Sequence, residues 1–142
     1  MGPDGHPIDD VIAVAGFRAA LRSFLRQSER VARQSGLTPQ RYLLLLMIKG
    51  APDGSGQSTV TDLARRLQLA QSTVTELVSR AEESGLVERE QSGRDGRVAY
   101  LRLTREGERR LEMSFTGLET ERRQLREAVD QLPTLHESPA LQ

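Results

Sequence analysis

The chain has 142 residues, of which 37% are hydrophobic and 28% charged, and its formal net charge is zero. It contains no cysteine, which excludes disulfides, thiolate metal sites, cysteine nucleophiles and thiol-based redox sensing. No nucleophile–base set, metal-ligand cluster, membrane-length apolar run or signal peptide is present. We therefore expect a cytoplasmic protein that is not an enzyme, needs no cofactor and makes no membrane contact. Because the charges balance, any contact with a polyanion has to come from local asymmetry.

A long helix is predicted to follow a flexible N-terminal tail, residues 1–7, and to end at Gly36. Its apolar residues recur at helical spacing and form a stripe: Val11, Val14, Phe17, Leu21, Phe24, Leu25 and Val31. Its arginines lie on a neighbouring face at spacings of three or four: Arg18, Arg22, Arg26, Arg30 and Arg33. Such a row is either a solvated face or a contact for phosphate or an acidic partner.

The next helix is predicted to be the centre of the core. Thr38 can cap it, and Pro39 falls in its first turn, where a missing N–H costs nothing. Residues 41–49 are apolar nearly all round, and a helix with that pattern is buried. Residues 50–57 contain three glycines and are predicted to form a flexible loop.

Two short amphipathic helices, separated by about three residues, are predicted between residues 59 and 83. Their apolar faces consist of Leu63, Ala64 and Leu67 in the first and Val74, Leu77, Val78 and Ala81 in the second. Thr59 and Asp62 have the spacing of a helix-start capping pair, and Gly85 suits a helix end. The pattern is that of a helix-turn-helix, whose second helix can enter the major groove of DNA.

A two-stranded ribbon is predicted after this pair. Residues 86–89 and 98–103 are strand-like, and residues 91–97 carry two glycines and form the hairpin tip. Helix pair and ribbon together predict a winged helix-turn-helix within residues 37–104. Thr104 is then expected to cap the following helix.

One long helix is predicted from about Arg105 to Leu132, before a C-terminal tail, residues 133–142. Its apolar residues step by alternating fours and threes in a heptad-like seam, with Arg122 in one place: Leu111, Phe115, Leu118, Leu125, Val129 and Leu132. This seam can pack on the first helix, yet a two-helix pair leaves apolar surface uncovered. We therefore predict a mainly α fold with a small β wing, and a homodimer formed through residues 8–36 and 105–132.

The chain resembles the MarR family of transcriptional regulators over roughly residues 10–132. The matching pieces, in order, are residues 37–42, 63–67, 72–75, 85–89, 94–97 and 103–107. The resemblance implies a homodimeric repressor that binds a palindrome-like operator in double-stranded DNA and is released by a small molecule, often a phenolic or aromatic acid. It also maps the family's wing Asp-x-Arg onto Asp95 and Arg97. Two positions depart from the family pattern: Ala70 replaces a capping serine, and Glu76 replaces a basic or neutral residue.

The candidate DNA-binding residues lie on the second helix of the pair and on the wing. Ser72 and Thr73 are expected to position the backbone or merely to cap the helix, whereas Gln71 and Thr75 are expected to read bases. Arg80 is a phosphate candidate. Glu76 has two interpretations: it accepts a hydrogen bond from cytosine N4, or it pairs with Arg80 at i+4. On the wing, Arg94 and Arg97 are expected to enter the minor groove, with Asp95 bracing Arg97.

Alternatives remain for both the effector and the function. If the resemblance holds, an effector cavity lies between the first helix, the core helix and the DNA-binding unit, with Tyr42 as a lining residue. The other interpretation of Tyr42 is a core tyrosine with a satisfied hydroxyl. A winged helix that binds protein without specific DNA binding is the main alternative function, and a DNA-binding protein without an effector is another.

Overall fold

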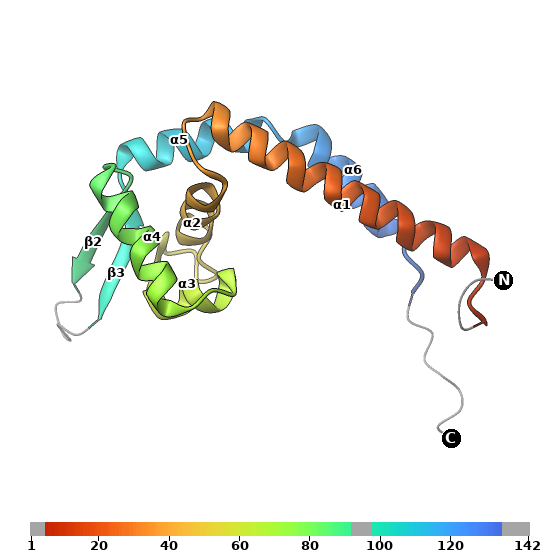
Figure 1. The fold of residues 1–142 in the computed structure, drawn as a ribbon, viewed down its shortest axis with the longest axis horizontal. Helices are drawn as coiled ribbons and strands as arrows, with labels where there is room; N and C mark the ends of the chain where they lie inside the picture. Colours follow the sequence, from red (N-terminus) through yellow and green to blue (C-terminus); the bar gives the residue numbers. More distant parts are fainter. Residues whose placement is uncertain (1–4, 92–97, 135–142) are drawn as a thin grey trace, which may run out of the picture. The chain divides into compact units, whose positions relative to one another are not determined.

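The computed structural model describes residues 5–91 and 98–134 (Figure 1). The chain forms two compact units: residues 28–117, and residues 1–27 together with 118–142. The first helix, α1 (Ile8–Gln34), runs through the boundary between them. Within the described ranges, no helix combines the length and the apolar character that a membrane span requires.

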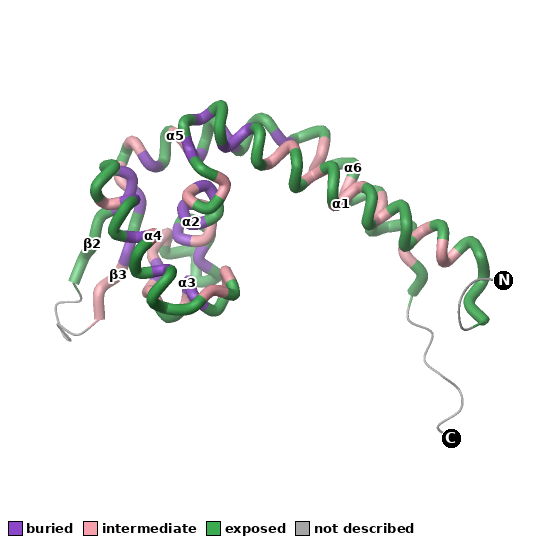
Figure 2. Tube along the Cα trace, in the orientation of Figure 1, coloured by how far each residue is buried: buried purple, intermediate pink, exposed green. Residues whose placement is uncertain are grey.

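The central helix of residues 28–117 is α2 (Pro39–Lys49), as predicted. Oγ1 of Thr38 accepts a hydrogen bond from the backbone N–H of Arg41 at 3.1 Å, which confirms the expected cap. The helix packs against most of the other helices and strands of this unit. Its buried face consists of Tyr42, Leu44, Leu45 and Ile48 (Figure 2). The prediction that this helix is buried on all sides was wrong, because Leu43 is 41% exposed.

The helix-turn-helix is confirmed as α3 (Val60–Leu67) and α4 (Gln71–Glu83). Thr59 Oγ1 accepts from the N–H of Asp62 at 3.2 Å, and the Asp62 carboxylate pairs with Arg65 at 2.7 Å. The turn uses Gln68 in the left-handed conformation, with φ of 56°. The helix α4 ends before Gly85, whose φ is 72°, as expected of a glycine helix stop.

The wing is part of a three-stranded antiparallel sheet with the strand order β1-β3-β2. The strands β2 (Val87–Gln91) and β3 (Ala99–Leu103) pair over their full length, from Val87 opposite Leu103 to Gln91 opposite Ala99. The third strand, β1 (Gln57–Ser58), lies where the sequence predicted loop, and it pairs with Arg102 and Leu101. Two residues are too few to show a strand pattern, and pairing with β3 is what makes them a strand.

The predicted last helix is two helices, α5 (Arg105–Thr116) and α6 (Glu119–Asp130). The chain leaves the helical conformation at Leu118, which is fully buried. A Cβ on Gly117 would lie 2.9 Å from Cγ1 of Val31, so this tight approach favours glycine, a poor helix former, at the break. The prediction of one continuous heptad-like seam was therefore wrong, because the break between α5 and α6 interrupts the repeat.

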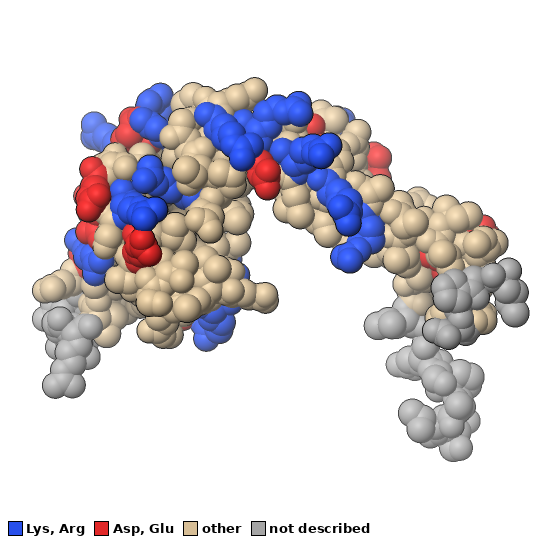
Figure 3. All heavy atoms as spheres, in the orientation of Figure 1, with Lys and Arg blue, Asp and Glu red and all other residues tan. Residues whose placement is uncertain are grey.

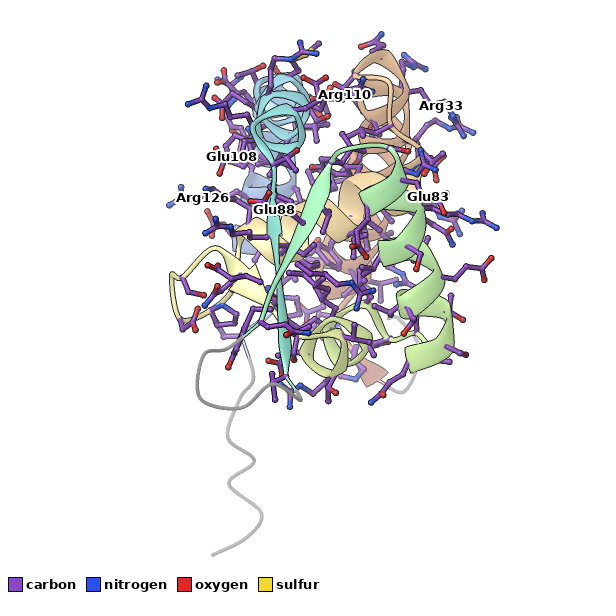
Figure 4. All side chains as sticks on the ribbon, turned by 90° about the vertical axis from the view of Figure 1, so that its left-hand side faces the viewer. Arg33, Glu83, Glu88, Glu108, Arg110 and Arg126 are labelled. Atoms are coloured by element: carbon purple, nitrogen blue, oxygen red, sulfur yellow. The ribbon has the colours of Figure 1, made fainter. Side chains whose placement is uncertain are left out.

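The helix α5 is tied to the rest of its unit by polar contacts. Thr104 caps it as predicted, with Oγ1 accepting from the N–H of Gly107 at 3.1 Å. Further along, Ser114 Oγ donates to Ser35 Oγ at 2.9 Å, and both residues are buried. Arg110 Nη1 donates to the carbonyl of Gly36 at 3.1 Å, and Figure 4 shows this arginine between α5 and the end of α1.

Candidate nucleic-acid interface

The helix α4 presents a polar face to solvent because its apolar residues hold the opposite face in the core. Val74, Val78 and Ala81 are completely buried. The four candidate contacts of its first two turns are all exposed: Gln71, Ser72, Thr73 and Thr75. The structure thus brings the expected recognition residues together on one accessible surface.

The first turn of α4 has no side-chain cap, as the alanine at this position led us to expect. Ala70 is the N-cap residue, and neither Ser72 nor Thr73 caps the helix in its place. The side chain of Gln71 instead reaches back to α3, where Nε2 lies 3.5 Å from Oγ1 of Thr61. Thr61 was not among the predicted site residues, and it adds its exposed hydroxyl to those of Ser72 and Thr73 beside the start of α4.

Glu76 and Arg80 form the predicted i,i+4 ion pair. Nη2 of Arg80 lies 2.7 Å from Oε1 of Glu76. The side chain of Arg80 is 61% exposed and that of Glu76 is 64% exposed, so the pair lies on the accessible surface of α4.

Ion pairs also neutralise the described part of the wing. Arg102 on β3 contacts Glu88 at 3.0 Å and Glu90 at 3.2 Å, both on the neighbouring strand β2. Arg89 contacts Glu82 at 2.8 Å. The predicted minor-groove residues, Arg94 and Arg97 with Asp95, lie outside the described residues.

A pocket of about 330 Å³ lies between the end of α2 and α5. Leu46, Leu111 and Phe115 make its apolar wall, and Lys49 and Glu108 stand at its edge with an ammonium–carboxylate distance of 2.6 Å. Tyr42 is buried but is not among the lining residues. The same ion pair also borders a more polar cavity of about 460 Å³, which reaches Glu88 and Arg102 of the wing strands.

Sequence reasoning did not identify this pocket, although one signal was available. Lys49 is the only lysine in a chain with 20 basic residues, and it ends a helix in which the seven preceding residues, 42–48, are apolar or aromatic. A long cation at that place suggests a partner on a neighbouring element, which the structure shows to be Glu108.

Two arginines near the start of α5 hold one carboxylate ionised. Arg109 donates to Glu106 through Nε at 2.9 Å and Nη2 at 2.6 Å, and Arg110 donates through Nε at 2.9 Å. These hydrogen bonds, first those of Arg109 and then that of Arg110, lower the pKa of Glu106 from 4.5 to about 2. No group of three or more His, Cys, Asp or Glu residues in the described part of the chain is arranged to hold a metal ion.

The predicted arginine row on α1 is exposed along its whole length. Figure 3 shows basic side chains along this helix. The five residues are exposed, and within the described residues none of them makes an ion pair: Arg18, Arg22, Arg26, Arg30 and Arg33. Whether the row binds a partner stays an open prediction.

Comparisons with known proteins relate this architecture to a family of transcriptional regulators. A family model described as MarR family matches residues 35–98, which contain α2, the helix-turn-helix and the first strand of the wing. The transcriptional repressor MdtR of Bacillus subtilis is 31% identical over 84 residues, which are 59% of this chain and 52% of that protein. The match thus spans about half the length of this relative.

Two solved structures share the fold. A mutant of MarR from E. coli in complex with operator DNA has a TM-score of 0.62 at 19% identity, covering 82% of this chain and 79% of that one. NadR in complex with 4-hydroxyphenylacetate has a TM-score of 0.68 at 22% identity, covering 91% and 85%. Family match, fold and exposed recognition helix together support a MarR-family, winged-helix transcriptional regulator with a DNA-binding function.

Proposed function

We propose that this protein is a homodimeric repressor that binds a palindromic operator and is released from it by a small-molecule effector. The observation that carries the proposal is the polar, accessible face of α4, held outward by three buried residues, Val74, Val78 and Ala81. A recognition helix of this kind enters the major groove with its N-terminal residues against base edges. Repression is supported by the name of the relative MdtR, a transcriptional repressor.

In this proposal the DNA-binding domain is residues 37–104, and its contacts divide by chemistry. Gln71 and Thr75 read bases, Ser72 and Thr73 bind the phosphate backbone, and Arg80 neutralises phosphate. Arg94 and Arg97 enter the minor groove from the wing, with Asp95 as a brace.

Dimerisation through residues 8–36 and 105–132 is supported by apolar surface that one chain leaves open. In residues 1–27 and 118–142, Leu118 is the only described residue that is buried. Large apolar side chains there are about half exposed: Ile8, Ile12, Val14, Leu25 and Val129. Burying such surface is the main driving force of association, and a two-fold dimer fits a palindromic operator.

The effector is proposed to enter the pocket between α2 and α5. Its volume of about 330 Å³ falls at the lower end of the range for small-molecule sites, roughly 300–1,000 Å³. An apolar wall with a few charged groups is the usual lining of such sites. The 4-hydroxyphenylacetate in the NadR structure supports a small aromatic ligand, and Lys49 is the cation that could meet its carboxylate.

The test of DNA binding is a fluorescence-anisotropy titration with a genomic fragment enriched by the protein, at two salt concentrations and with competitor DNA. Arg80→Ala is expected to weaken binding and reduce the salt dependence, whereas Arg123→Ala on α6, another exposed arginine, is the matched control and should not. If no fragment is bound in preference to competitor DNA, the protein-interaction alternative replaces this proposal.

The effector is tested separately by thermal shift with 4-hydroxyphenylacetate and related aromatic acids. Stabilisation of the wild type that is lost in Lys49→Met, together with release of DNA, is the expected result. Stabilisation of neither protein, with unchanged DNA affinity, would rule out an aromatic-acid effector.

A further inference from the structure

The recognition helix points one long acidic side chain directly away from the core. Its buried face is made by Val74, Val78 and Ala81. Counting about 100° of rotation per residue, Glu76 lies within about 40° of the direction opposite to each of them. Ser72, one turn earlier on the same face, has a short side chain and is exposed. Glu76 therefore projects further toward any ligand that meets the centre of this face.

A bare carboxylate at this position would be repelled by DNA phosphates, but Glu76 is not bare. Its Oε1 lies 2.7 Å from Nη2 of Arg80, which cancels its charge and fixes its direction. The contact occupies one of two carboxylate oxygens and one of five guanidinium N–H donors. The second oxygen, Oε2, can still accept a hydrogen bond while the ion pair stays formed.

We propose that Glu76, braced by Arg80, accepts a hydrogen bond from N4 of a cytosine in the major groove and so specifies one base in each operator half-site. The inference deepens the proposed function and rests on it. The two interpretations of Glu76, ion pair and base reader, then describe one arrangement, in which Arg80 is a positioning residue.

The choice of cytosine follows from the groove edges of the four bases. Guanine presents N7 and O6 and thymine presents O4, all of them acceptors that repel a carboxylate. Adenine has an N6 donor, but its N7 acceptor stands beside it. Cytosine presents the N4 amino group as its hydrogen-bonding group, so it is the base that an acceptor-only side chain selects.

The experiment is selection of binding sites from a random pool of duplex DNA by the full-length wild type and three variants. The wild type should enrich a motif with cytosine at one position of each half-site, preferred by roughly 5- to 100-fold over other bases. Glu76→Gln should move that preference to adenine, because glutamine pairs with adenine N6 and N7. Glu76→Ala should lose the preference there and keep the rest of the motif. Glu83→Gln, an exposed glutamate in the last turn of α4, is the matched control and should enrich the wild-type motif.

Two results would overturn the inference while leaving DNA binding intact. In one, Glu76→Ala enriches the wild-type motif and binds every sequence more tightly, as a purely repulsive charge requires. In the other, Glu76→Gln leaves the base preference unchanged. A wild type that enriches no motif would overturn the proposed function as well. Because Glu76 is largely exposed, the variants are expected to keep the wild-type melting temperature, which circular dichroism verifies.

The role of Arg80 is tested by a double-mutant cycle with Arg80→Ala and Glu76→Gln. If Arg80 positions Glu76, Arg80→Ala should reduce the affinity for the cytosine site by a different factor in the wild type than in Glu76→Gln. Identical factors in both backgrounds would mean that Arg80 acts on phosphate alone, and the bracing would be refuted.

Discussion

Gly107 in the first turn of α5 lies directly against the backbone carbonyl of Leu86 at the start of the wing. A Cβ atom on Gly107 would collide with this carbonyl oxygen and would also lie 3.3 Å from Cβ of Leu103. The contact packs the first turn of α5 against both ends of the wing, because Leu86 follows α4 and Leu103 ends β3. This glycine is therefore required by packing against backbone, which cannot move aside as a flexible side chain can.

Gly107→Ala is expected to lower the free energy of unfolding by about 1–3 kcal/mol, the usual cost of overpacking a core. The matched control is Gly16→Ala, within α1, where an added Cβ meets nothing within 4 Å. That change should raise the free energy of unfolding by about 0.5–1 kcal/mol, since alanine is the better helix former. Urea denaturation of the three proteins measures both effects. Equal shifts in the two variants would show that helix propensity, not the Leu86 contact, decides the outcome.

Dimerisation predicts a defined change in mass. Light scattering after size exclusion should show the wild type as a dimer at micromolar concentration. Ile12→Glu with Val129→Glu should give a monomer, because both side chains are about half exposed in one chain and a charge there would be buried against the partner. Leu43→Glu, an exposed apolar residue of α2, serves as control and should stay dimeric. A monomeric wild type would refute the prediction.

The pH dependence of stability should carry the signature of Glu106. Its folded pKa of about 2 lies below the ordinary value of 4.5, so the unfolded chain binds the proton more tightly. The carboxylate therefore contributes stability above about pH 4.5, and this contribution disappears as the pH falls toward about 2. The difference in unfolding free energy between wild type and Glu106→Gln should shrink over that window. A difference that stays constant from pH 7 to pH 2 would contradict the shifted pKa.

The wing is tested by Arg97→Ala. If Arg97 enters the minor groove, operator binding should weaken by about 1–3 kcal/mol, and the slope of log affinity against log salt should fall by roughly 1 for the lost phosphate contact. Anisotropy titrations of wild type and variant at several salt concentrations measure both quantities. Arg126→Ala on α6, an exposed arginine outside the DNA-binding domain, is the control. Superimposable titrations of the wild type and Arg97→Ala would leave the wing without a part in binding.

Most of the architecture could be predicted because its signals are local. Thr38, Thr59 and Thr104 all cap the helices that they were expected to cap, since a hydroxyl and a free N–H need only neighbouring residues to meet. The helix-turn-helix and the two main wing strands likewise follow from periodicity and glycine stops. The exposed residues of α4 could be placed for the same reason.

The errors concern features that depend on distant parts of the chain. The strand β1 exists because β3 offers it a partner. The break after α5 depends on the contact of Gly117 with Val31 and on the burial of Leu118, neither of which the heptad-like spacing of the segment reveals. The pocket beside Lys49 needs Glu108, which lies 59 residues away. Of the two interpretations of Tyr42, the structure supports the core tyrosine, because its side chain is buried and does not line that pocket.

The balanced charges of the wing strands, Arg89 and Arg102 against Glu88 and Glu90, bear on how such a regulator is distributed in a cell. Binding to random DNA depends almost entirely on attraction to phosphate, and a chromosome offers about a million or more competing random sites. We expect a chain of zero net charge whose wing strands carry balanced charges to be held only weakly by these sites. If the proposed function holds, a larger fraction of its molecules then stays free to occupy the operator. Few copies per cell would then be enough for control. When the effector concentration falls, rebinding to the operator would not be delayed by slow dissociation of the protein from random genomic sites.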